Sequence, residues 1–125
     1  MPNPSTVNAT ASGKEVIRRS YFDGVGETEE TILLGVANHI MTIISIIICD
    51  RSGQADNQFD LYVDFDAGGT DVYLLKNQSI GANNTFVFTD RFALTATDKL
   101  HIVGVSSAGT AQYDVWCTYI DQDWS

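Results

Sequence analysis

The sequence predicts an all-β fold, an antiparallel β-sandwich of jelly-roll type with about eight strands. The first observation is that short apolar runs recur along the chain, separated by polar clusters rich in Gly, Asn, Asp and Ser. Short strands at near-regular spacing with polar turns are typical of sandwiches and barrels. The second observation is that no segment has the sustained helical spacing of apolar residues that would predict a helix.

The first three expected strands cover residues 16–22, 31–36 and 40–49. Residues 16–22 are the first strand candidate, and residues 24–30 form the polar, Gly-containing loop that follows it. Residues 31–36 alternate so that Ile32, Leu34 and Val36 share one face, which is the period of a strand. Residues 40–49 are the strongest apolar run, and Asp, Ser and Gly in residues 50–53 then turn the chain.

The remaining expected strands cover residues 58–66, 71–76, 85–88, 92–94, 100–105 and 113–120. The run 58–66 alternates most clearly and places one set of apolar side chains in the core: Phe59, Leu61, Val63 and Phe65. Its other face, which includes Asp60, Tyr62 and Asp64, is expected to face water. Residues 67–70, Ala-Gly-Gly-Thr, predict a hairpin turn.

The run 40–49 is apolar on both faces of the expected strand. Its even positions suit the core: Ile40, Ile44, Ile46 and Ile48. Its odd positions would form the second face: Met41, Ile43, Ile47 and Cys49. An uncharged, Ile-rich face is an aggregation hazard if it stays exposed, so something must cover it. A loop or the N-terminal strand of the same chain could do so, and so could another subunit.

Composition limits the classes of function. The chain has 125 residues, of which 44% are apolar, so we expect one domain with a real core. It carries 7 Lys and Arg against 16 Asp and Glu, a net charge of −9, which argues against nucleic acid and anionic membranes as partners. Residues 1–13 are Pro, Asn, Ser, Thr, Ala and Gly-rich and predict a flexible arm. Residues 14–125 are expected to form the single sandwich domain.

The sequence predicts no catalytic residues, no metal site and no cofactor. His39 and His101 have no partner at a metal-ligand spacing, and the chain has no Gly-x-Ser-x-Gly motif. A hydrolase on this scaffold would need a pocket with carboxylates of shifted pKa. Cys49 and Cys117 lie in apolar runs; buried free thiols are the favoured reading, and a disulfide is the alternative. No secretory signal is seen at the N-terminus, which fits a protein made in a reducing cytoplasm.

A series of strand and turn patterns runs in order through the chain. They occupy residues 47–53 (IICDRSG), 59–63 (FDLYV), 73–80 (YLLKNQSI), 84–88 (NTFVF), 94–100 (LTATDKL) and 113–120 (YDVWCTYI). In this order they resemble small β-sandwich structural proteins of tailed bacteriophage virions. The resemblance covers residues 31–121. Thr97 departs from it, since such proteins often have Gly there, and this changes a turn.

The resemblance implies a non-enzymatic virion component, above all a capsid decoration (cement) protein that stabilises the shell from outside. Such proteins are commonly homotrimers seated on the major capsid protein, so the implied location is the outer capsid surface after synthesis in the host cytoplasm. The residues expected to contact another subunit or the capsid are Met41, Ile43, Ile47, Asn3, Pro4 and Val7.

The alternative is a tail or fibre accessory protein, as a β-sandwich module that binds glycans. Exposed aromatic rings can stack on sugars, and the candidate contacts are Tyr62, Tyr73 and Trp124. Core or interface packing is the commoner fate of such rings.

Overall fold

The computed structural model describes residues 14–65, 69–106 and 111–124, which form nine strands and no helix. These residues therefore include no helix that could cross a membrane. The strands are β1 (Lys14–Val25), β2 (Glu30–Leu34), β3 (His39–Asp50), β4 (Gln58–Phe65), β5 (Thr70–Ser79), β6 (Thr85–Phe88), β7 (Phe92–Thr95), β8 (Lys99–Val105) and β9 (Tyr113–Asp123). The predicted arm, residues 1–13, lies outside the described residues, as do 67 and 68 of the predicted hairpin turn.

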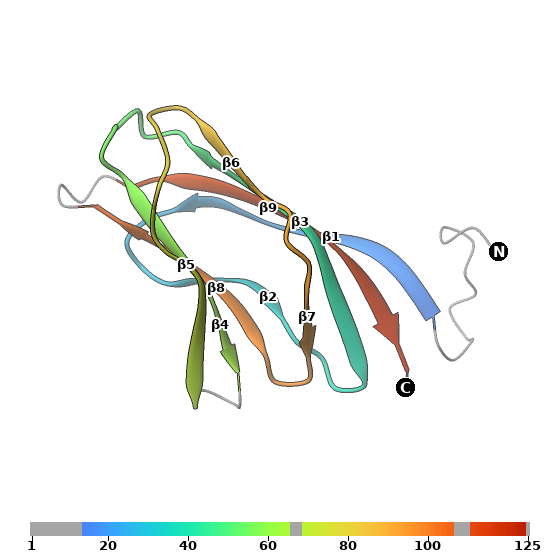
Figure 1. The fold of residues 1–125 in the computed structure, drawn as a ribbon. Coiled ribbons are helices and arrows are strands. Elements are labelled where there is room, and N and C mark those ends of the chain that lie inside the picture. The colour runs from blue at the N-terminus through green and yellow to red at the C-terminus, as the bar shows by residue number, and fades with distance from the viewer. Residues whose placement is uncertain (1–13, 66–68, 107–110, 125) are drawn as a thin grey trace.

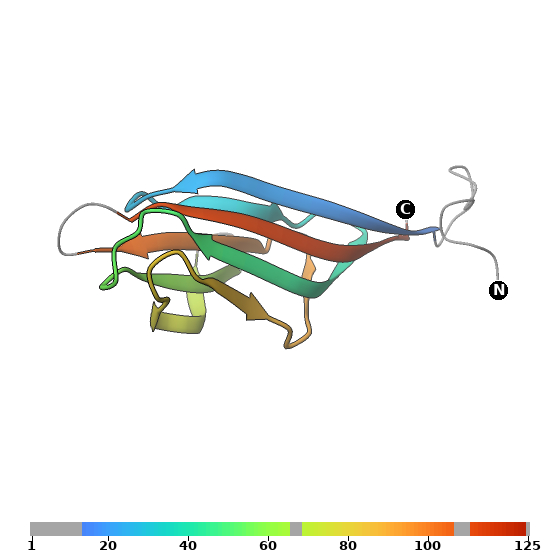
Figure 2. The same ribbon diagram turned by 90° about the horizontal axis from the view of Figure 1, so that it is seen from above.

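Two antiparallel sheets face each other (Figures 1 and 2). Sheet A has the order β1-β9-β3-β6, and β7 pairs with β3 beyond β6 on the same edge. Sheet B has the order β2-β8-β4-β5. With β6 and β7 taken as one interrupted strand, each sheet has four strands in the jelly-roll order. The predicted all-β sandwich is confirmed.

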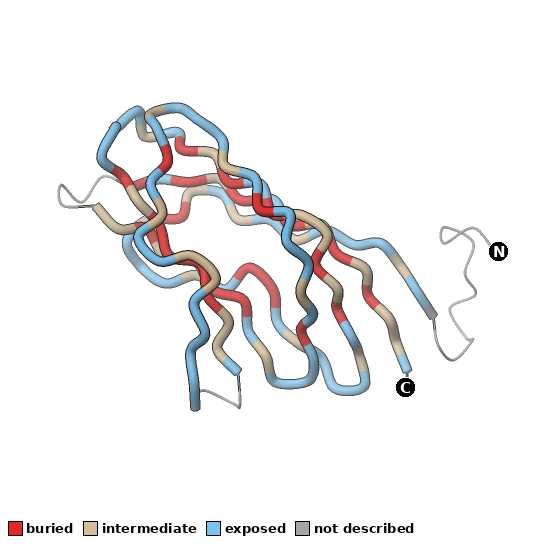
Figure 3. Tube along the Cα trace, viewed as in Figure 1, coloured by how far each residue is buried: buried red, intermediate tan, exposed pale blue. Residues whose placement is uncertain are grey.

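The core lies between the sheets, and the buried residues, red in Figure 3, concentrate on the central strands. Phe59 of β4 packs edge-on against Phe86 of β6 and Tyr113 of β9, with ring centroids 5.6 and 5.8 Å apart. The Tyr113 hydroxyl donates to the Gln58 carbonyl oxygen at 2.8 Å. Because its one polar group is satisfied, the large Tyr113 ring can be fully buried.

A β-bulge changes which face of β3 meets the core. The register against β9 shifts between Ile43 and Ser45, so one extra residue is inserted in β3. Before the bulge, Met41 and Ile43 point inward and are 4% and 0% exposed; after it, Ile46 and Ile48 do so. The prediction that Met41 and Ile43 belong to a second, outward face is therefore wrong. The prediction that Ile40 lies in the core is also wrong, because this side chain is exposed.

The second face of β4 also departs from the prediction. Asp60 and Tyr62, expected in water, are buried, and Phe65, expected in the core, is exposed at the strand end. Asp60 stays buried because it accepts hydrogen bonds from the Lys76 ammonium at 3.0 Å and from the Asn77 amide at 2.6 Å. Alternation alone does not reveal these partners, because they come from the neighbouring strand.

A pair of substitutions in β3 tests the bulge. We expect Ile43→Ala to lower the free energy of unfolding by about 2–5 kcal/mol, because it leaves a cavity in the core. Ile40→Ala, the matched control on the exposed side, should cost less than about 1 kcal/mol. Chemical denaturation of both variants measures the difference. Equal costs, or a larger cost for Ile40→Ala, would mean that the strand alternates without the bulge.

Candidate interaction surface

A row of exposed apolar side chains crosses the outer face of sheet A. Tyr21 of β1 stands opposite Trp116 of β9, Trp116 opposite Ile47 of β3, and Ile47 opposite Val87 of β6. Their exposed fractions are 63%, 42%, 39% and 52% in that order. Side chains directly opposite on one face of a sheet are in contact range, so these four form one continuous surface. We call it the apolar row.

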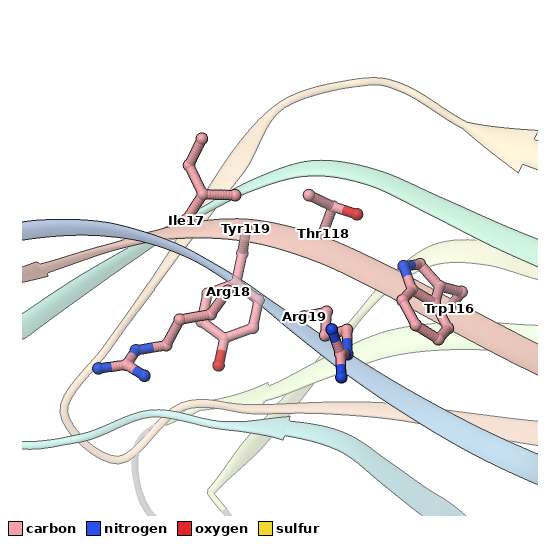
Figure 4. Close-up of a pocket in the computed structure, with 6 residues that line it drawn as sticks. All are labelled: Ile17, Arg18, Arg19, Trp116, Thr118 and Tyr119. Carbon is pink, nitrogen blue, oxygen red and sulfur yellow. The ribbon is translucent and has the colours of Figure 1, made fainter. Parts of the chain in front are cut away.

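Ring stacking gives the apolar row a flat, ordered end. The rings of Tyr21 and Trp116 stack with centroids 5.7 Å apart and planes 17° from parallel. The Arg19 guanidinium lies 5.4 Å from the centre of the Trp116 ring, a cation–π distance. Figure 4 shows the neighbouring depression, where Ile17 and Thr118 lie on the outer side of the β1–β9 pair. These contacts fix the aromatic side chains in place before any partner binds.

The charges beside the apolar row are nearly balanced. Arg51 lies 2.8 Å from an oxygen of Asp23 and 3.4 Å from one of Asp114, and these two aspartates stand opposite each other on β1 and β9. Together with Arg19, the row is bordered by two acidic and two basic side chains. Glu15, near the start of β1, accepts a hydrogen bond from the Gln122 side-chain amide at 2.8 Å. This face therefore carries little of the −9 of the chain.

The predicted interface residues are divided by the structure. Met41 and Ile43 lie in the core, whereas Ile47 lies in the apolar row. Asn3, Pro4 and Val7 lie outside the described residues. Sequence reasoning did not assign Tyr21, Trp116 or Val87 to an interface, because only the strand pairing places them beside Ile47. The one signal available for Tyr21 was its position in the expected strand 16–22.

The predicted glycan-contact rings do not form one platform. Tyr62 is buried in sheet B, 4.9 Å from the Tyr73 ring and 5.4 Å from the His101 ring, and its hydroxyl donates to Glu29. Tyr73 is exposed, with the Lys76 ammonium 4.5 Å from its ring centre.

Trp124, the third ring of the predicted set, follows β9 of sheet A. Its amide donates to the Asn38 carbonyl oxygen at 2.9 Å. The structure thus brings Tyr62 and Tyr73 together and places Trp124 on the other sheet.

The two histidines are held by carboxylates. His39 Nδ1 lies 2.7 Å from buried Asp121, whose other oxygen accepts from Arg18 at 2.9 Å, which ties β1, β3 and β9 together. His101 is buried, 3.0 Å from the Thr31 hydroxyl and 3.6 Å from Glu29. In the part of the chain that the structure describes, no three His, Cys, Asp or Glu side chains are placed to hold a metal ion. Both histidines have structural partners.

Both cysteines are free thiols, in agreement with the favoured prediction. Cys117 faces the core opposite Ile46, and Cys49 is half-buried opposite Asp114, beside the apolar row. Burial raises the pKa of the Cys117 thiol from 9.0 to about 12. The core thiol is therefore unreactive, and the thiol at the surface is the accessible one.

No protein-family model matches the sequence, and no curated protein matches it. Among solved structures, the chain is similar to a chain in the structure of infectious bursal disease virus, Gx strain, with a TM-score of 0.57 and 10% identity over 94% of this chain and 36% of that one. A mutant VP2 protein of infectious bursal disease virus, in derived T=1 particles, gives a TM-score of 0.56 and 12% identity over 94% of this chain and 34% of that chain. The chain thus spans about a third of the length of these two chains. At such low identity, the likeness shows a shared fold.

The raised pKa of Cys117 predicts alkaline destabilisation. Below pH 9.0 the thiol is protonated in both states; between pH 9.0 and about 12 only the unfolded chain loses the proton, so the free energy of unfolding falls as pH rises. The free energy of unfolding falls by at most about 1.4 kcal/mol per pH unit from this group. Urea titrations from pH 8 upward, done with Cys117→Ala and with Cys49→Ala as the control, measure it. Only Cys117→Ala should flatten the slope; identical slopes in both variants would refute the assignment.

Proposed function

We propose that this chain is a non-enzymatic structural protein of a virion, and specifically a capsid decoration (cement) protein that binds the shell from outside. The observation that carries the proposal is the apolar row on the outer face of sheet A. A contiguous exposed apolar surface with polar borders is typical of a protein interface. Fold alone does not define function, so the VP2-like jelly roll supports the proposal but does not carry it.

The charge distribution supports an outward location. The chain carries −9 overall, so a shell-bound copy would be repelled by the phosphates of a packaged genome. On sheet B, Asp64 stands opposite Asp71. On the outer face of sheet A, Arg19 and Arg51 balance the two aspartates beside the apolar row. The nearly neutral apolar face therefore suits assembly.

The proposed partners are other copies of the chain, as a homotrimer, and the major capsid protein. In this arrangement residues 1–13 form an arm, separate from the sandwich, whose Asn3, Pro4 and Val7 contact the shell or a neighbouring subunit. The arm carries no charged side chain, so it can lie along an apolar groove without the cost of burying charge. The proposed location is the outer capsid surface, after synthesis in the host cytoplasm.

The second candidate is a tail or fibre accessory module that binds glycans. The observation that favours it is the exposed Tyr73 ring beside Tyr62 on sheet B. A sugar that stacks on Tyr73 would need the ring face on which the Lys76 ammonium lies, so the Lys76 side chain would have to move.

Binding to shells tests the proposed function. Purified full-length protein is mixed with particles that lack it, and the particles are separated by sedimentation and imaged by electron cryomicroscopy. We expect binding that saturates at a fixed ratio to the major capsid protein, with new density on the outer surface. Density confined to the tail, or binding to glycans lost in Tyr73→Ala, would instead favour the second candidate. Absence of the protein from purified virions would contradict both.

Deletion of residues 1–13 tests the arm. We expect the truncated protein to unfold at the same denaturant concentration as the full chain, because the described strands begin at Lys14. Its affinity for shells should fall by about tenfold or more, because the arm contacts are lost. Unchanged shell binding by a folded truncated protein would refute a role for the arm and leave the sandwich as the binding element.

A further inference from the structure

We infer that the apolar row is the surface through which copies of this chain bind one another. The inference rests on the proposed function, that of an assembly protein, and deepens it by naming the face and the partner. Three observations bear on it: the protection of the sheet edges, the area of the row and its charge balance.

The sheet edges are protected against strand-to-strand association. The free edge of β1 carries Arg18 and Arg19 near its middle, so antiparallel pairing of two β1 strands would bring like charges together. At the edges of sheet B, β2 has only five residues and β5 carries exposed Asp71 and Lys76. The other edge of sheet A is divided into β6 and β7, of four residues each. Association is therefore disfavoured at the sheet edges, and a sheet face is the remaining surface through which copies can bind.

The apolar row is large enough for a homomeric contact. With Ile17, which is also exposed, it offers roughly 450 Å² of mostly apolar surface, taking about 200 Å² for a whole aromatic side chain. A standard interface buries about 800 Å² per partner, and about 65% of a homodimer interface is apolar, which is roughly 520 Å².

The charges around the row fit another copy of this chain. Two chains of −9 repel each other over most of their surface, and this repulsion is weakest where the face is nearly neutral. Arg51 neutralises one of the two adjacent aspartates, Asp23 and Asp114, so one acidic charge remains. Arg19, which lies over Trp116, supplies the matching basic charge on the same face. A strongly charged partner would find no complementary charge here.

Matched substitutions at two exposed valines test the inference. Val87 lies in the row and Val72 on β5 of sheet B, with exposed fractions of 52% and 46%. Sedimentation velocity of full-length protein at micromolar concentration should show an oligomer for the wild type and for Val72→Glu. Val87→Glu should be monomeric, with association weakened about 100-fold or more, because the interface would bury an unpaired carboxylate. Equal unfolding midpoints of the two variants would show that both are folded.

Cys49 and Trp116 provide a second readout on the wild-type surface. Maleimide labelling of Cys49 should slow by about tenfold when the protein is concentrated enough to associate, since burial in the contact blocks the thiol. With Trp124→Phe, the remaining fluorescence of Trp116 should shift to shorter wavelength over the same concentration range. A monomeric wild type, association of Val87→Glu equal to that of wild type, or labelling that is independent of concentration would overturn the inference.

Failure of the inference and failure of the proposed function give different results. A monomer in solution that still binds shells would overturn the self-association and leave the decoration role in place. An oligomer that depends on Val87 but is absent from virions would support the apolar row as a contact between copies and contradict the virion role.

Discussion

The pairing of β3 with β9, interrupted by one bulge, is the constraint on which the rest of the structure depends. β3 pairs with β9 on one edge and with β6 and β7 on the other. These two hydrogen-bonded edges determine which of its side chains face the core. The extra residue between Ile43 and Ser45 turns the later half of the strand relative to the first. As a result Ile43 and Ile46 both fill the core, and Ile47 stands outside beside Trp116.

The sequence allowed the strands and their class to be predicted, because each strand is a local pattern of apolar residues between turn residues. The run 85–88, for example, was predicted with the bounds that β6 has. The faces of the strands were harder, because they depend on neighbours. Asp60 can be buried because it pairs with Lys76 of the adjacent strand. Met41 faces the core because of a bulge in the pairing of β3 with β9. The apolar row could not be assembled from the sequence, since its members lie far apart in the chain and only the registers align them.

The distribution of polar groups gives this sandwich two unlike faces. Sheet B buries Asp60, Tyr62 and His101 within a network of hydrogen bonds, ion pairs and ring contacts, which holds these polar side chains in place. Sheet A keeps its outer aromatic and aliphatic side chains exposed, ordered by stacking rather than covered. With the edges charged, short or divided, exposure of this one face is best explained by a partner.

The central claim is that the outer face of sheet A is buried in the assembled protein. A structure of the assembled oligomer, with side chains resolved, tests it most directly. We expect Tyr21, Trp116 and Val87 to lose their exposure against another copy of the chain. An assembly in which these three side chains remain in solvent, with the copies joined through strand edges or through sheet B, would contradict it.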